Sequence, residues 1–205
     1  MIRAGADIEF DDGGPLKNAV SYYSVGAVRA LLESGAAVDG PDGGGMPMAY
    51  ALTFGFTDIA ELLERGGAQL DMRFAAGLGR LDLVKSFVNP DGSLRPDAGR
   101  LADPYENRFR CERTRQNILC QALAFACGHA QLEVARFLLE LGADPNQEVP
   151  GLNQPGGTVL QALTAGVPFG ASRDARDYDE RRIDELLAND QCAGRTARSG
   201  SQSCD

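Results

Sequence analysis

The 205-residue chain has no tryptophan, a single histidine and only two lysines, Lys17 and Lys85. One imidazole excludes zinc sites and acid–base mechanisms that require two or more histidines. Neither glycine-rich stretch, 40–45 or 77–82, is followed by the lysine of a nucleotide-binding phosphate loop. We therefore expect neither a cofactor nor a metal ion.

Long apolar runs are also missing. No stretch approaches the ~18 consecutive apolar residues that a membrane helix needs, and the first ten residues lack the apolar core of a secretory signal. The five cysteines are odd in number and irregularly spaced, which is not typical of a disulfide framework. We expect a cytoplasmic protein with reduced thiols and no membrane contact.

Positive charge is scarce, since 20 Lys and Arg residues face 29 Asp and Glu residues and the net charge is -9. Such a surface is repelled by phosphate, so nucleic acid and anionic membranes are not expected partners. One local exception is a basic run opposed only by Glu112, and it predicts a docking patch. The basic residues are Arg108, Arg110, Arg113 and Arg115.

What the chain does have is an internal repeat. Residues 15–39 and 47–71 place proline, alanine, a Leu-Leu pair, glycine and aspartate in register, 32 residues apart. Pro15 and Pro47 suit the first position of a helix. A second, antiparallel helix follows a break near Tyr23 or Gly55, and its apolar residues recur at helical spacing. Gly35 and Gly67 then provide left-handed caps, and the apolar face comprises Ala27, Val28, Leu31 and Leu32 in one unit and Ile59, Ala60, Leu62 and Leu63 in the other.

These residues resemble the ankyrin repeat, whose pattern runs roughly TPLHxAxxxGHxxVVxLLLxxGADxN. The segment GHAQLEVARFLLELGADPN at 128–146 is the closest match within the chain. The fragment at 2–9 is similar to the tail of an earlier repeat, MRFAAGLGRLDLVKSFVNPDG at 72–92 to a unit without its hairpin finger, and TVLQAL at 158–163 to the start of a last unit. The opening tetrapeptides GPLK, MPMA, NILC and TVLQ depart from the family's TPLH.

The resemblance implies an all-α fold, an ankyrin-type α-solenoid of antiparallel helix pairs with short hairpin fingers, interrupted by two loop insertions. It extends over residues 1–189, and 190–205 is expected to be a disordered tail. The fourth unit carries about two extra residues, since Gly128 to Gly142 exceeds the family spacing. The expected units are 1–10 (partial), 13–42, 45–71, 72–92, 117–147 and 157–189 (irregular), with insertions at 93–116 and 166–178.

The function that the resemblance implies is non-catalytic binding of another protein through the concave face of first helices and fingers. The positions expected to face solvent are Asn18, Ser21, Tyr22, Tyr50, Thr53 and Phe54, and exposed aromatics are favoured interface anchors. Their alternative role is packing between repeats. The expected finger acids are Glu9, Asp11, Asp12 and Asp42, and Arg108, Arg110 and Arg113 are the basic candidates in the insertion.

Two other functions stay open. The chain could be a regulatory or accessory domain of an enzyme, or a weak hydrolase whose carboxylates lie in the insertions. The carboxylate pairs are Asp103 with Glu106 and Asp177 with Asp179. We expect a monomer whose uncapped ends allow self-association.

For several single residues we expect a structural role rather than a role in binding or catalysis. His129 is expected to be a turn histidine, and Cys120 and Cys127 to be small buried hydrophobes. The aspartates that follow each unit's glycine are expected to cap turns at one recurring point. They are Asp7, Asp39, Asp71 and Asp144.

Overall fold

The computed structural model describes residues 7–101 and 112–147, apart from the side chain of Asp12. The chain divides into two compact units, 1–172 and 173–205, and every described residue belongs to the first. The expected partial unit at the N-terminus lies mostly outside the described residues. The expected last unit, the second insertion, the tail, Arg108 and Arg110 lie wholly outside them.

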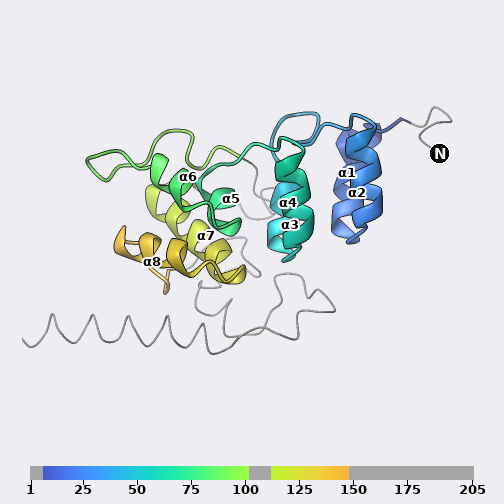
Figure 1. Ribbon diagram of the computed structural model, residues 1–205. Coiled ribbons are helices and arrows are strands. Elements are labelled where there is room, and N and C mark those ends of the chain that lie inside the picture. Colours follow the sequence, from blue (N-terminus) through green and yellow to red (C-terminus); the bar gives the residue numbers. More distant parts are fainter. Residues whose placement is uncertain (1–6, 102–111, 148–205) are drawn as a thin grey trace, which may run out of the picture. The chain divides into compact units, whose positions relative to one another are not determined.

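The described part of the chain is all-helical, which confirms the predicted class, and an antiparallel bridge between Val88 and Leu94 is its β contact. Each odd-numbered helix contacts the even-numbered helix that follows it, and α1, α3, α5 and α7 contact one another in succession (Figure 1). The eight helices are α1 Phe10–Ser21, α2 Val25–Glu33, α3 Met46–Thr53, α4 Thr57–Arg65, α5 Met72–Gly77, α6 Leu81–Ser86, α7 Arg115–Gly128 and α8 Leu132–Glu140.

All four helix pairs are joined by the same turn. In each turn one residue has a positive φ, and the residue after it donates its N–H to an alanine carbonyl five positions earlier. This hydrogen bond ends one helix and fixes where the next begins. The positive-φ residues are Tyr23 (52°), Gly55 (73°), Gly79 (71°) and Ala130 (54°), and the accepting alanines are Ala19, Ala51, Ala75 and Ala126.

The position of the turn in the fourth helix pair differs from the repeat register predicted from the sequence. Its positive-φ residue is Ala130, not Gly128, and Ala130 precedes Gly142 by the same interval that separates residues 23 and 35 or 55 and 67. The extra residues therefore lie at the start of α7, before the repeat. Met46, which opens the second unit, precedes its turn residue Gly55 by the same interval at which Gln121 precedes Ala130. The fourth unit therefore opens at Gln121, and the prediction that it opens at Asn117 was wrong.

The first helix also begins differently from the prediction. Helix α1 starts at Phe10, and its first turn is irregular because Asp11 and Gly13 have φ values of 56° and 75°. The regular right-handed helix begins only after Gly13, and Pro15 lies in its first turn, where its missing N–H costs nothing. Pro47 is the second residue of α3 and follows Gly45 (φ 79°).

The second helices bury most of the apolar face that the sequence predicts, whereas Ala27, Leu32 and Leu62 of that face are half-buried. Burying each of these large aliphatic side chains stabilises the fold by about 1.5–3 kcal/mol. The predicted left-handed caps are confirmed at Gly35 and Gly67, with φ values of 90° and 93°, and Gly142 repeats them at 97°. The fully or nearly buried residues are Val28, Leu31, Ile59, Ala60, Leu63, Val134, Ala135 and Leu138.

Carboxylates link each unit to the next. Glu9 Oε1 accepts the Ala37 N–H at 2.7 Å, and Asp39 Oδ1 accepts the Gln69 N–H at 2.9 Å. In the third unit, which lacks a finger, Asp71 Oδ2 accepts the N–H of Leu101 at 3.2 Å. The first part of the insertion, 93–101, therefore occupies the place of the missing loop.

The aspartates do not all lie at one recurring point, contrary to the prediction. Asp7 and Asp144 each accept the N–H two residues ahead within their own turn, from Glu9 at 3.0 Å and Asn146 at 2.9 Å. They cap turns, as predicted. The linking position lies two residues later in each unit.

We predict that Ala130→Gly stabilises the protein. Alanine at a left-handed φ costs about 1–2 kcal/mol, whereas glycine adds about 0.4–1 kcal/mol of unfolded-state entropy. The side chain of Ala130 is exposed, so little packing is lost. Urea denaturation should show that the free energy of unfolding rises by about 0.5–1 kcal/mol.

Tyr23→Gly is the matched control, since Tyr23 has the same backbone conformation. Its ring contacts Phe56 and its hydroxyl is hydrogen-bonded to Asp58, so the change should destabilise by about 1–2 kcal/mol. Equal effects of the two substitutions would contradict the account.

Candidate partner-binding face

Four aromatic side chains, Tyr23, Phe56, Phe54 and Tyr50, are in contact in succession at the first two helix pairs, and the exposed Tyr22 precedes Tyr23 in the first turn. We call Tyr22, Tyr23, Tyr50, Phe54 and Phe56 the aromatic edge. Ring centroids are 4.7 Å apart for Tyr23 and Phe56, 5.7 Å for Phe54 and Phe56, and 5.6 Å for Tyr50 and Phe54. Phe56 is buried, whereas Tyr22 is 83% exposed and Tyr23 42% exposed. The row thus has a packed base and an exposed rim.

Tyr23 is held in place from both ends. Its backbone has a left-handed φ of 52°, which only a well-packed environment maintains for a non-glycine residue. Its hydroxyl donates to Asp58 Oδ2 at 2.9 Å, and Asp58 Oδ1 accepts the N–H of Ile59 at 2.9 Å. The first turn is therefore fixed to the start of α4.

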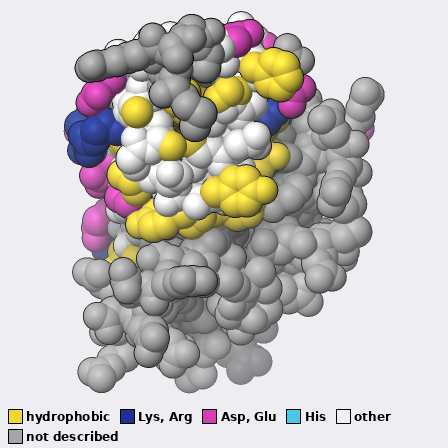
Figure 2. All heavy atoms as spheres, turned by 90° about the vertical axis from the view of Figure 1, so that its right-hand side faces the viewer, with side chains coloured by type: hydrophobic (Ala, Val, Ile, Leu, Met, Phe, Trp, Pro, Cys, Tyr) yellow, Lys and Arg dark blue, Asp and Glu magenta, His cyan; other side chains and the backbone are white. Residues whose placement is uncertain are grey.

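The side chains expected to face solvent differ in how exposed they are. Asn18 and Tyr22 are exposed, and Ser21, Tyr50 and Phe54 are half-buried. Thr53 is buried, so the prediction was wrong for it. Figure 2 looks at the end formed by α1 and α2 and shows hydrophobic side chains across that face, with charged ones mostly at its margins.

Among the described units, exposed tyrosine and phenylalanine side chains lie in the first two. Leu78 corresponds to Phe54 in the turn register and is buried, and Phe74 and Phe125, which correspond to Tyr50, are buried as well. Helix α5 lies close to both neighbours, because a Cβ on Gly77 would come within 2.9 Å of Leu52. The candidate face therefore lies on α1, α3 and their turns.

The finger acids differ in what they contact. Glu9 is engaged with Ala37, and Asp42 is exposed and accepts the Gly44 N–H at 3.0 Å. Asp11 is also exposed, and the side chain of Asp12 lies outside the described residues. Asp11 and Asp42 are thus the two expected finger acids that the structure leaves at the surface.

Arg113 links the two described parts of the first insertion, 93–101 and 112–116. Its Nη1 donates to the carbonyl of Arg100 at 2.7 Å and its Nη2 to the carbonyl of Leu101 at 3.4 Å. Residues 102–111 lie between these parts and outside the described residues. Arg115 is also used internally, since it donates to the carbonyls of Gly92 and Leu141.

A buried ion pair supports this region. Arg73 donates to Asp71 Oδ2 through Nε at 3.0 Å and through Nη2 at 2.7 Å, and through Nη1 to Gln121 Oε1 at 3.0 Å. It also donates to the Leu101 carbonyl. Asp71 Oδ1 caps α5 by accepting the N–H groups of Arg73 and Phe74. Sequence reasoning missed this pair, although an arginine at the histidine position of the family's TPLH was its signal.

His129 bridges α7 to the turn between α3 and α4. Its Nε2 lies 2.9 Å from the Leu52 carbonyl and its Nδ1 lies 3.0 Å from Thr57 Oγ1. Burial lowers the pKa of the imidazole, and the bond to Leu52 opposes that shift. This geometry agrees with the expected structural role.

The described thiols show no sign of reactivity. Cys120 is buried and donates to the Asp144 carbonyl at 3.3 Å, and burial raises its pKa. Burial raises the pKa of Cys127 to about 12. Both sulfurs are therefore protonated at neutral pH, unlike the thiolate of a nucleophile.

Residues 7–101 and 112–147 offer neither a metal site nor a membrane-spanning helix. These residues contain no group of three or more His, Cys, Asp and Glu side chains arranged to hold a metal ion. In the same ranges, no helix combines the length and apolar character required to cross a bilayer.

The comparison with protein families confirms the predicted resemblance for one segment. Residues 120–148 match the ankyrin repeat model. The match covers most of α7 and all of α8, and its start agrees with a repeat that opens at Gln121 rather than Asn117. No curated protein matches the chain.

We predict unequal costs for the two halves of the buried ion pair. Asp71→Ala leaves the Arg73 charge buried without its partner and should cost about 3–5 kcal/mol in urea denaturation. Arg73→Met should cost less, because three backbone N–H groups still bind the Asp71 carboxylate. Equal losses, or a loss below about 1 kcal/mol for Asp71→Ala, would show that the pair is not the anchor of this region.

Proposed function

We propose that this protein is a non-catalytic interaction module that binds a partner protein through the first-helix and turn face of its first two units. The aromatic edge carries the proposal, because Tyr22 is 83% exposed on a turn that Tyr23 and Asp58 hold rigid. A rigid exposed aromatic loses little conformational entropy on binding, which is why such residues are enriched at interface hot spots.

The wider binding face extends to the finger and the insertion. Asp11 at the start of α1 and Asp42 in the finger before α3 add negative charge at the finger end of the same two units, which favours a partner with basic groups and speeds association. We assign the segment around Arg108 and Arg110 a second contact, with Arg113 holding its base together.

The same proposal includes a solenoid architecture. Successive contacts among α1, α3, α5 and α7 support stacking of the helix pairs, and 157–189 would add an irregular last unit. Ankyrin repeats generally mediate protein binding and are typically non-catalytic. We expect a monomeric, cytoplasmic protein that binds neither nucleic acid nor membrane, in line with its net charge of -9.

The alternative functions receive no support from the described residues. The proposed hydrolase pairs, Asp103 with Glu106 and Asp177 with Asp179, lie outside them. A regulatory domain of an enzyme would also act by binding a protein, so the same experiment applies to it.

We predict that Tyr22→Ala weakens partner binding at least tenfold without loss of stability. Truncating a hot-spot aromatic typically costs about 2 kcal/mol or more, whereas Tyr22 makes few contacts in the free protein. A photo-crosslinking amino acid at position 22 in the native host identifies the partner. Calorimetry with the purified partner then compares the affinities of the wild type and the variant.

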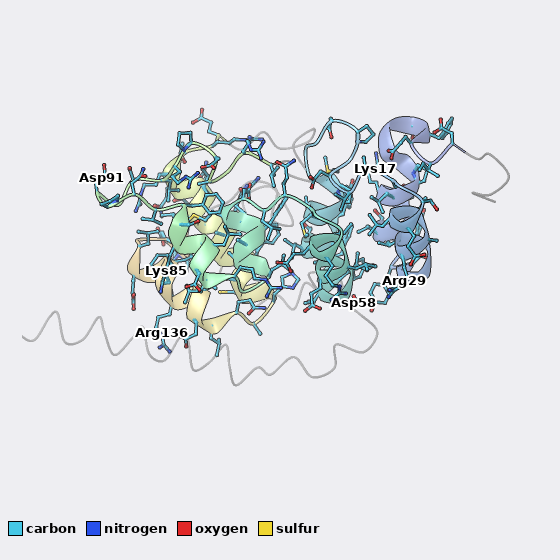
Figure 3. The ribbon with its side chains drawn as sticks, turned by 45° about the horizontal axis from the view of Figure 1, so that its top comes forward. Lys17, Arg29, Asp58, Lys85, Asp91 and Arg136 are labelled. Atoms are coloured by element: carbon cyan, nitrogen blue, oxygen red, sulfur yellow. The ribbon has the colours of Figure 1, made fainter. Side chains whose placement is uncertain are left out.

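Arg29→Ala with Arg136→Ala is the matched control. Both are exposed side chains of second helices, and Figure 3 shows Arg29 of α2 at one end of the described helices and Arg136 of α8 at the other. The control variant should bind like the wild type. Unchanged affinity of the Tyr22→Ala variant would exclude the aromatic edge as the binding face.

A further inference from the structure

Negative charge is concentrated in the part of the chain that carries the aromatic edge. Residues 1–70 contain ten Asp and Glu residues against four Lys and Arg residues, so this third of the sequence holds two thirds of the net charge of -9. Arg65, one of those four basic residues, is already paired with Glu61 on α4. Figure 2 shows acidic side chains at several points around the margin of the end formed by α1 and α2. The first two units therefore present a negative field to an approaching partner.

Beside the first turn, a carboxylate lies against a tyrosine ring. The hydroxyl of Tyr23 donates to Asp58 Oδ2 at 2.9 Å, and Asp58 Oδ1 accepts the N–H of Ile59 at 2.9 Å. Each carboxylate oxygen has more than one lone pair, so both oxygens can accept a further hydrogen bond. The Asp58 side chain is exposed, and Figure 3 shows it at the end of α4 that lies beside the α1–α2 pair. A donor from a partner protein can therefore reach it.

This geometry suits a guanidinium better than an ammonium group. A guanidinium presents two parallel N–H groups that match the two oxygens of a carboxylate, and its plane stacks on aromatic rings. The ring of Tyr23 is 42% exposed and lies next to Asp58, and the neighbouring Tyr22 is 83% exposed. A lysine ammonium is a point charge that cannot make the paired contact. Arginine is therefore the side chain that fits both the carboxylate and the rings.

A second group of exposed side chains lies at the finger end of the same two units. A Cβ on Gly13 would come within 2.7 Å of Pro41 Cδ, so the first turn of α1 packs against the finger. Asp11 and Asp42 lie close in the chain to these two residues, and both are exposed. Phe10, which precedes Asp11, is 70% exposed. Carboxylate and aromatic groups thus occur at this end as well.

We infer that the partner contacts this face with an arginine-bearing segment, in which one arginine binds at Asp58 and another at the finger acids Asp11 and Asp42. This inference rests on the proposed function, since it names the chemistry of the partner for the same face. Helix α3 separates the finger from the turn, and its eight residues span about 12 Å. In an extended peptide, which advances about 3.3–3.6 Å per residue, the two arginines must be at least about four residues apart.

Synthetic peptides test the inference without the partner. The probe is a peptide of glycine and serine with two arginines about five residues apart, titrated into the isotopically labelled full chain and followed by NMR. We expect the amide signals of residues 22–24 and 54–58 to shift, and the shifts to weaken with added salt because the contacts are exposed ion pairs. The signals of residues 78–82, the corresponding turn of the third unit, should not move. The same peptide with citrulline in place of arginine should not bind, and the lysine peptide should bind more weakly.

Asp58→Asn removes the charge and keeps an oxygen that can accept from the Tyr23 hydroxyl. It should weaken binding of the arginine peptide about fivefold, the upper range for an exposed ion pair. Asp82→Asn is the matched control, because Asp82 is exposed and lies three residues after the positive-φ residue of its turn, as Asp58 does. Both residues lie in the first turn of a second helix. The control variant should bind the peptide like the wild type.

No shift with the arginine peptide, or equal binding of the citrulline or lysine peptide, would overturn the inference. Equal affinities of the Asp58→Asn and Asp82→Asn variants would overturn it as well. Shifts of the same signals with protein concentration alone would identify a second copy of this chain as the occupant, and would also contradict it. None of these measurements uses the partner, whereas the test with Tyr22→Ala does, so the two proposals fail separately.

Discussion

The rest of the structure depends on one backbone hydrogen bond, which runs from the residue after each turn to an alanine carbonyl five positions earlier. It occurs with a positive φ in the turn, and a small residue at the accepting position suits the packing between neighbouring first helices. Ala19, Ala51, Ala75 and Ala126 occupy the accepting position in all four pairs. Glycine has the positive φ in two turns, while Tyr23 and Ala130 adopt it at a steric cost. Once this bond is set, the start of every second helix and the direction of its apolar face are determined.

The loss of one finger explains the unusual polar core. Where a finger is present, a single carboxylate binds one backbone N–H of the next unit, as Asp39 binds Gln69. Asp71 runs directly into α5 and has no such loop to meet, so its carboxylate is enclosed by α5, Arg73 and Leu101. A buried charge needs a partner, and Arg73 supplies it while also reaching Gln121 in the fourth unit. The ion pair thus orders the part of the insertion that substitutes for the finger.

The features that could be predicted from the sequence were those that recur at a regular spacing along it. The apolar faces of the second helices and the caps at Gly35 and Gly67 follow from spacing and from the need for glycine at positive φ, and both are confirmed. The fourth turn was not predictable by the same rule, because Ala130 occupies the glycine position and Gly128 beside it drew the register two residues away. The burial of Thr53 and the pairing of Arg73 depend on neighbours in other units. A single repeat does not encode such contacts.

The candidate binding face is asymmetric for a physical reason. In the third unit Gly77 lets α5 approach α3 and α7 closely, and the side chains that would form the groove, Phe74 and Leu78, become core. In the first two units the equivalent side chains remain at the surface, held by contacts at the turns rather than by a covering helix. A face supported in this way is rigid only while its turns are rigid. The hydroxyl of Tyr23 fixes the first turn and the imidazole of His129 contacts both sides of the second, so the geometry of the candidate binding face depends on these two side-chain contacts.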